Sequence, residues 1–123
     1  MLNNRQKLGK KSESIAVRHL KKMGYRILEQ NYRTKTGEID IIAKDNNTLV
    51  FVEVKARRSK EFGNPKYAIT PNKQRKISMI ALYYLKTTRQ SNTRARFDVV
   101  SITYQKKDLN IEVIKNAFEL AYT

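Results

Sequence analysis

Two runs of β-branched residues joined by a short turn constrain this chain more than any other feature. The runs are Gly37–Ala43 (GEIDIIA) and Leu49–Lys55 (LVFVEVK), and the turn-forming stretch Asp45-Asn46-Asn47 lies between them. Such a pattern predicts a β-hairpin with its turn centred on the two asparagines. The first run is apolar on both sides of its acid, which indicates that the hairpin lies at the centre of a sheet.

Strand alternation gives this hairpin two different faces. One face is uniformly apolar and is predicted to be core: Ile39, Ile41, Ala43, Val50, Val52 and Val54. The other face carries Glu38, Asp40, Ile42, Phe51, Glu53 and Lys55. The turn sets the register, which puts Asp40 directly opposite Glu53. The same register puts Glu38 opposite Lys55.

Asp40 and Glu53 are therefore predicted to be close enough to repel each other. Directly opposed Cβ atoms lie about 4.5–5.5 Å apart in an antiparallel pair. Two carboxylates at that separation take up a proton or hold a cation between them, and a hard divalent cation prefers oxygen ligands. The backbone carbonyl of Val54 is a candidate third ligand. The alternative is an ordinary solvated strand face, with Glu38 and Lys55 as a simple cross-strand ion pair.

The rest of the chain predicts a small α/β domain, spanning residues 1–123, with a mixed sheet and a helical crossover. Apolar residues at helical spacing and a stop at Gly24 predict a first helix over Lys7–Met23. Thr70 as N-cap, followed by Pro71, predicts the start of a second helix. The element order is α-β-β-β-α-β-β. The less distinct segments are a short strand at Arg26–Leu28, a basic loop at Arg57–Pro65, strands at Arg96–Tyr104 and Ile111–Ile114, and a terminal helix at Asn116–Tyr122.

The charge balance indicates a polyanionic partner. Lysine and arginine total 26 against 11 acidic residues, a net charge of +15 in 123 residues. This favours nucleic acid first and an anionic membrane surface second, without separating an enzyme from a structural binder. The absence of cysteine excludes disulfides, thiolate zinc sites and a cysteine nucleophile.

The chain carries no recognisable membrane or export signal. No stretch approaches the roughly 20 apolar residues that a membrane span needs, and Met1–Lys11 is basic without the apolar core of a signal peptide. We therefore expect a cytoplasmic protein with no membrane partner.

Several blocks of the sequence, in order, resemble one known group of proteins. Gly37-Glu38-Ile39-Asp40 followed by Phe51-Val52-Glu53-Val54-Lys55 resembles the acid…acid-x-lysine motif of the PD-(D/E)xK nucleases, which include restriction endonucleases and archaeal Holliday-junction resolvases. Within that superfamily, the chain resembles the YraN family of small bacterial proteins over roughly Gly9 to Val100. The further blocks that carry the resemblance are Asn31-Tyr32-Arg33, FVEVKAR, Phe62-Gly63, Pro65, the run Thr70–Gln74 and Arg96-Phe97-Asp98.

The resemblance implies a restriction-endonuclease-like fold, a mixed central β-sheet flanked by helices, with a nuclease-type metal site. It implies that Asp40 and Glu53 are ligands of Mg²⁺ or Mn²⁺. It also implies that Lys55 positions the attacking water and stabilises charge that develops on the phosphate.

Two helical residues enter the site through the resemblance alone. Glu13 matches the acid that completes the site from the first helix, although Ser12 stands where the family usually has glycine. Without the resemblance, Glu13 is an ordinary solvated acid. Gln74 matches a position on the second helix that often faces the site. Basic residues expected to contact nucleic acid are Arg33, Lys35, Arg57, Arg58 and Lys73.

The leading hypothesis is a metal-dependent nuclease acting on DNA, including branched or distorted DNA, with a homodimer as one expectation for its assembly. One alternative is a non-catalytic nucleic-acid-binding module that keeps the nuclease fold. Another is a basic adaptor that binds a protein with an acidic surface.

Overall fold

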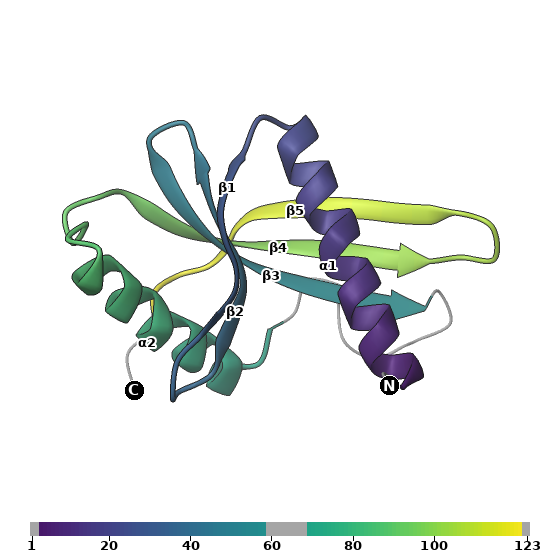
Figure 1. Cartoon of the computed structure of the whole chain (residues 1–123), viewed down its shortest axis with the longest axis horizontal. Helices are drawn as coiled ribbons and strands as arrows, with labels where there is room; N and C mark the ends of the chain where they lie inside the picture. The colour runs from purple at the N-terminus through teal and green to yellow at the C-terminus, as the bar shows by residue number, and fades with distance from the viewer. Residues whose placement is uncertain (1–2, 59–68, 122–123) are drawn as a thin grey trace.

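The computed structural model describes residues 3–58 and 69–121 (Figure 1). The elements are, in chain order, α1 (Asn4–Lys22), β1 (Arg26–Arg33), β2 (Glu38–Asp45), β3 (Thr48–Arg58), α2 (Pro71–Thr87), β4 (Ala95–Tyr104) and β5 (Leu109–Phe118). The predicted α/β order is confirmed. Arg57 and Arg58 belong to β3, so the predicted basic loop begins later than expected, and residues 59–65 of that loop lie outside the described residues.

One five-stranded sheet has the order β1-β2-β3-β4-β5. β3 and β4 are parallel, and every other neighbouring pair is antiparallel. The parallel pair requires a crossover, because a tight hairpin joins only antiparallel strands, and α2 lies in that connection. A mixed sheet flanked by two helices is the restriction-endonuclease-like architecture that the sequence predicts.

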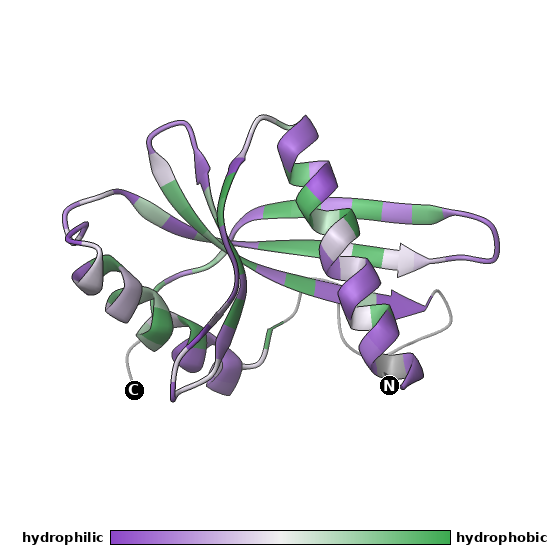
Figure 2. Cartoon of the chain, viewed as in Figure 1, coloured by the Kyte–Doolittle hydropathy of each residue, from purple (hydrophilic) through white to green (hydrophobic). Residues whose placement is uncertain are grey.

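The two helices cover opposite faces of this sheet. Residues of α1 pack on one cluster of buried side chains: Ile41, Ala43, Val50, Val52, Val100 and Ile102. Residues of α2 pack on the other: Ile39, Ile42, Leu49, Phe51 and Phe97. Hydrophobic residues fill the middle of the strands, and the outward sides of both helices are more polar (Figure 2). Because both faces are covered, a polar group on a central strand is withdrawn from solvent.

The predicted faces of the hairpin are wrong at Glu38, Ile39 and Asp40. Glu38 and Asp40, expected beside Ile42 and Phe51, line a pocket next to α1 together with Val54. Ile39 was expected beside Ile41 on a single apolar face, but it packs with Ile42 under α2. Regular alternation would place residues 39 and 41 on one face, so the alternation of side chains along β2 changes between them. Asp40 is the residue at which this change occurs.

Both helix starts have conventional caps. Asn3 and Gln6 form a capping box at α1, so that helix begins three residues before the predicted Lys7. The hydroxyl of Thr70 accepts from the amide of Lys73 ahead of Pro71, as predicted. None of the helices in residues 3–58 and 69–121 is long and apolar enough to cross a membrane.

The predicted terminal helix is wrong, because β5 continues through Phe118. The ring of Phe118 stacks on Phe97 of β4 with centroids 4.8 Å apart. The backbone amide of Ala121 then donates to Oγ of Ser78 on α2 at 2.9 Å. Pairing with β4 and burial of an aromatic ring outweigh the weak helical preference of this segment.

A network of ion pairs and hydrogen bonds joins β4 to the end of β2 and to Tyr25, just before β1, away from Asp40 and Glu53. Asp98 is fully buried on β4 and accepts from Arg96 at 3.0 Å and from the hydroxyl of Tyr25 at 3.1 Å. Arg96 also donates to Asp45 at 2.7 Å. A buried carboxylate is stable only when it is paired and hydrogen-bonded in this way. Asp98 therefore has a structural role in holding these strands together.

Candidate metal centre

Asp40 lies at the point where β2 separates from β3. The predicted register holds from the turn to Ile41 and Val52, where the ladder ends. The amide of Val54 then donates to Oδ2 of Asp40 at 2.8 Å. A side-chain carboxylate thus takes the place of a backbone carbonyl, and it opens the hairpin beside Glu53. Asp40 and Glu53 are within hydrogen-bonding reach of each other, although the ladder does not pair them.

Glu53 is largely buried, with a side chain 13% exposed. Burial raises its pKa to about 8, and the neighbouring charge of Asp40 adds to the rise. Lys73, at the start of α2, lies 3.3 Å from Oε2 of Glu53 and opposes that shift. One lysine does not neutralise the combined charge of two close carboxylates, so the site retains an affinity for a further cation or proton.

Glu13 comes to the same place from α1. The preceding residue, Ser12, is buried, with its hydroxyl 2.7 Å from the carbonyl of Leu8 and 2.8 Å from the hydroxyl of Tyr104. Serine at this position therefore anchors the helix on β4. Glu13 is directed toward Asp40, and burial raises its pKa to about 7, with the charges of Asp40 and Glu38 contributing.

Asn31 on β1 links the acids of α1 and β2. With its side-chain amide nitrogen facing the carboxylates, it donates to Oε1 of Glu13 at 2.9 Å and to Glu38. Its backbone has φ 53°, a left-handed conformation that asparagine tolerates better than most residues. Glu38 pairs with Arg33 across the β1–β2 ladder at 3.5 Å. Arg33 is thus an ion-pair partner of Glu38.

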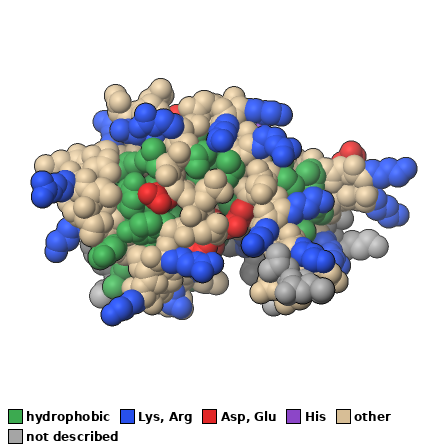
Figure 3. All heavy atoms as spheres, in the orientation of Figure 1, with side chains coloured by type: hydrophobic (Ala, Val, Ile, Leu, Met, Phe, Trp, Pro, Cys, Tyr) green, Lys and Arg blue, Asp and Glu red, His purple; other side chains and the backbone are tan. Residues whose placement is uncertain are grey.

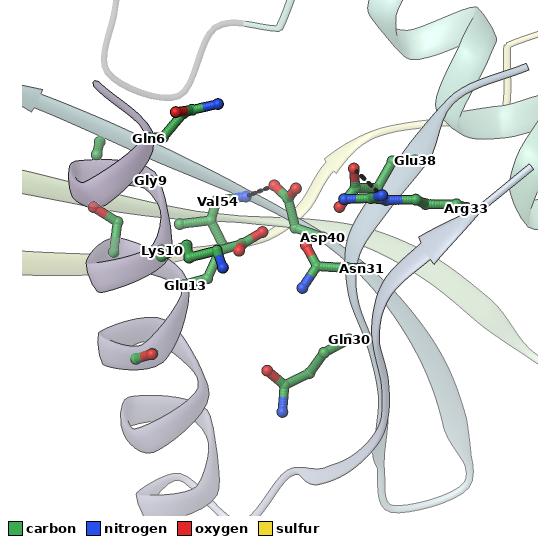
Figure 4. A pocket seen from close by; sticks show the side chains of 13 residues that line it. Gln6, Gly9, Lys10, Glu13, Gln30, Asn31, Arg33, Glu38, Asp40 and Val54 are labelled. Atoms are coloured by element: carbon green, nitrogen blue, oxygen red, sulfur yellow. Dashed lines mark hydrogen bonds and ion pairs between the residues drawn. The ribbon is translucent and has the colours of Figure 1, made fainter. Parts of the chain in front are cut away.

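Glu13, Glu38 and Asp40 line a pocket of about 800 Å³ between α1 and the strands β1 to β3, and Glu53 is not among its lining residues. Figure 4 shows Glu13 reaching from the helix toward Asp40, with Asn31 below them and Glu38 beside Arg33. Carboxylate oxygens of Glu13, Glu38 and Asp40 lie within 4.8 Å of one another. Three oxygens at this spacing are close enough together to hold a metal ion.

The donor set selects the class of metal. Every side chain of the cluster offers oxygen, which suits Mg²⁺ or Mn²⁺ and disfavours softer metals that seek sulfur or imidazole. Burial, and then repulsion from neighbouring acids, raises the pKa of Glu13 and of Glu53, which favours an added cation if all the carboxylates are to be ionised near neutral pH. The residues present therefore fit a hard divalent cation.

The other predicted site residues lie around this cluster. Lys55 is half-buried on β3, two residues beyond Glu53, and is paired in the ladder with Ser101 of β4. Val54 lines the pocket, is paired with Val100 in the β3–β4 ladder, and donates its amide to Asp40. The side chain of Gln74 donates to the carbonyl of Ile69 at 2.8 Å, which ties the first turn of α2 to the segment before it.

The predicted phosphate-binding cations lie at different distances from the cluster. Arg33 is exposed at the rim of the pocket, and Lys73 contacts Glu53. Lys35 is exposed in the turn after β1. Arg57 and Arg58 lie at the end of β3, beyond Lys55 in the strand. Arg33 and Lys73 each form an ion pair with an acid of the site, Glu38 and Glu53 respectively.

Two contributors to the centre escaped the sequence analysis. Asn31 was noted only as part of a block of resemblance, and its contact with Glu13 joins segments that lie far apart in the chain. Lys73 was assigned to phosphate, and its contact with Glu53 depends on how α2 is placed over the sheet. The sequence contains no signal for the contact of Asn31 with Glu13 or of Lys73 with Glu53, because local sequence does not specify how a helix docks on a sheet.

Comparison with known proteins gives consistent matches over nearly the whole chain. A model of the uncharacterised protein family UPF0102 matches residues 12–102, which include all four acids of the cluster. A UPF0102 protein of Desulfosudis oleivorans is 57% identical over 119 residues, 97% of this chain and 95% of that protein. A UPF0102 protein of Syntrophus aciditrophicus is 55% identical over 114 residues, 93% of this chain and 90% of that protein. UPF0102 protein GSU0650 of Geobacter sulfurreducens is 49% identical over 116 residues, which cover 94% of this chain and 91% of that protein.

Proposed function

The chain belongs to the UPF0102 family, the YraN family that its sequence blocks resemble, and we propose that it is a metal-dependent nuclease that hydrolyses phosphodiester bonds in DNA. The observation that carries this proposal is the convergence of Glu13, Asp40 and Glu53 from three different elements. Glu38 joins them from β2. Four of the 11 acids of a chain with net charge +15 gather at this one place. Such a concentration opposes the overall charge of the protein, which is the arrangement expected of a cation site on a polyanion-binding surface.

We assign the cation to the oxygens of Asp40, Glu13 and Glu53. A divalent cation held there supplies a Lewis acid and lowers the pKa of bound water. The backbone amide of Val54 orients Asp40, and the side-chain amide of Asn31 orients Glu13. These hydrogen bonds fix the direction of the carboxylates before any ligand arrives, which lowers the cost of organising the site.

The cations near the cluster provide the complementary half of the site. Lys55, on the same strand as Glu53, is proposed to stabilise negative charge that develops on the phosphate. Lys73 and Arg33 flank the acids from α2 and β1 and are proposed to contact neighbouring phosphates. Gln74 is proposed to act indirectly, since its side chain holds the start of α2, which carries Lys73.

The decisive experiment is a cleavage panel with fluorescent single-stranded, duplex and branched DNA. Each substrate is incubated with Mg²⁺, with Mn²⁺ and with a chelator. We expect cleavage only with metal, and a loss of more than about a hundredfold in Asp40→Asn, because changing even indirect supports of a metal typically costs 10–100-fold. Asp108→Asn is the matched control, since Asp108 is an exposed acid in the turn between β4 and β5.

The same panel separates the non-catalytic alternative. Retained binding of DNA with no cleavage under any metal would identify a binding module that keeps the nuclease fold. Equal cleavage by wild type and Asp40→Asn would show that the activity comes from elsewhere, and would overturn the assignment of the acids.

A further inference from the structure

The acidic pocket continues as a groove along α1. A second cavity, of about 270 Å³, is lined by Val17, Arg18 and Lys21 of the helix. It shares two lining residues with the acidic pocket, Ser14 of α1 and Gln30 of β1. The two cavities therefore adjoin each other, and together they make up the groove between α1 and the edge strand β1. At one end of it lie the acids, and at the other end lie two basic residues.

One side of α1 supplies the basic wall of this groove. Lys10, Ser14 and Arg18 follow one another at intervals of four residues, and Lys21 comes three residues later, so all four lie on the same side of the helix. The three cations are exposed. Lys10 and Lys21 are separated by about 16 Å along the helix axis, from the rise of 1.5 Å per residue. In Figure 3, basic side chains follow the course of α1, and acidic ones lie beside it near the middle of the face.

The opposite wall is polar and adds no negative charge away from the metal centre. Gln30 and Asn31 of β1 line it, with Arg33 at the end nearest the acids. Glu29 is the acid closest in sequence, and its charge acts on Tyr84 of α2, on the other face of the sheet. A polyanion lying in the groove thus meets amides and cations until it reaches the acidic cluster.

The size of the groove indicates one strand rather than two. The larger cavity, about 800 Å³, is within the range of about 300–1,000 Å³ typical of sites that enclose small ligands. A short stretch of a single strand fits such a space, and a double helix does not. The residues that line the two cavities include no aromatic ring, so the groove offers phosphate contacts without the base stacking of many single-strand binders.

We propose that this groove binds a single strand of nucleic acid through its phosphates and leads it to the acidic cluster. Lys10, Arg18 and Lys21 contact phosphates along the strand, and the bases face away from the protein. The substrate class is then a free single strand, or an unpaired end or flap of a larger DNA, without sequence preference. This proposal rests on the proposed nuclease function for the role of the acids, and its binding step is tested separately from cleavage.

The test compares two double variants that remove equal charge. Arg18→Gln with Lys21→Gln alters the groove, and Lys106→Gln with Lys107→Gln alters two exposed lysines in the turn between β4 and β5. Binding of a fluorescent oligodeoxythymidylate and of a duplex of equal length is measured by anisotropy in Ca²⁺ over a salt series. Thermal melts of all three proteins confirm that each is folded.

We expect wild type to bind the single strand more tightly than the duplex. The groove variant should lose roughly tenfold in affinity for the single strand, and its salt dependence should fall by about 1.4 in log–log slope, for two lost phosphate contacts. The turn variant should bind like wild type. Equal losses in the two variants, or a preference of wild type for duplex, would overturn the groove proposal.

The outcomes for binding and cleavage are independent. Groove-dependent binding of the single strand without cleavage in Mg²⁺ or Mn²⁺ would support the groove and contradict the nuclease proposal. Metal-dependent cleavage that is the same in wild type and in the groove variant would support the nuclease proposal. It would contradict the proposal that the groove leads the strand to the acidic cluster.

Discussion

The backbone amide of Val54 donates a hydrogen bond to the side chain of Asp40 at the place where β2 and β3 stop pairing. This one contact both ends the ladder and fixes the direction of a carboxylate in the candidate metal centre. It explains why the hairpin opens at its acids. A regular continuation of the same register would put Val54 opposite Ile39, and its amide would then bond to backbone instead.

Two substitutions at Asp40 should have opposite effects on the stability of the metal-free protein. Asp40→Asn keeps an acceptor for the amide of Val54 and removes a charge that repels Glu53, so the melting temperature should rise. Asp40→Ala leaves that amide without its partner and should cost about 1–3 kcal/mol of unfolding free energy. Both variants should lose binding of Mg²⁺ in calorimetry. A melting temperature that falls equally in both would contradict the repulsion between the acids.

The stability of the metal-free protein should fall as the pH rises toward 8. Glu13 and Glu53 have folded-state pKa values of about 7 and about 8, raised from 4.5. Above pH 4.5 the folded state therefore holds more protons than the unfolded state, and the free energy of unfolding decreases with pH until the folded groups ionise. Thermal melts in a chelator should show this decrease between about pH 5 and pH 8.

Mg²⁺ should oppose that decrease, because it binds the ionised acids of the folded state. The rise in melting temperature on adding Mg²⁺ should thus be larger at pH 8 than at pH 5. Glu53→Gln, which does not titrate, should flatten the pH dependence in chelator. A flat profile in the wild type itself would argue against close acids.

Lys73 should hold down the pKa of Glu53. Its ammonium lies 3.3 Å from Oε2 of that acid, so Lys73→Met should move the pKa of Glu53 above its value of about 8. Lys76→Met on the same helix is the matched control, because Lys76 is exposed. Carboxyl NMR titration of the metal-free protein measures the effect. Equal titration in both variants would mean that Lys73 points away from Glu53 in solution.

Asn31 should be required for its backbone conformation as well as for its amide. Asn31→Gly and Asn31→Val both remove the donor to Glu13 and Glu38, so a comparison of the two isolates the backbone. At φ 53° a β-branched residue is strained, and Asn31→Val should be less stable than Asn31→Gly by about 1–2 kcal/mol in urea unfolding. Similar stabilities would show that β1 relaxes at this point.

Strong local signals predicted most of the fold. The hairpin register held from the turn to Ile41 and Val52, because a short turn and alternating apolar residues leave few other pairings. Thr70 and Pro71 marked the start of α2, because a cap and a proline act within one helical turn. The end of the chain was predicted wrongly as helix, because β5 is stabilised by β4 and by the Phe97 ring, which lie far away in sequence.

The residues of the candidate site could likewise be predicted only in part. Asp40 and Glu53 could be found from the hairpin, because two acids opposed on central strands are unusual in a sequence. Glu13 was brought in by resemblance alone, since an acid on a polar helix has no local feature that distinguishes it. Its position depends on the anchoring of Ser12 against Tyr104, a contact between α1 and β4.

The sequence by itself determined the two-strand frame and the identity of the acids that lie on it. Strand periodicity and turn chemistry act over a few residues, so they are legible without a structure. Only the tertiary structure decided that Glu13, Asn31 and Lys73 join Asp40 and Glu53, and that the hairpin opens there. Those contacts depend on how two helices dock on opposite faces of one sheet, and docking follows from the packing of whole surfaces and the pairing of buried charges.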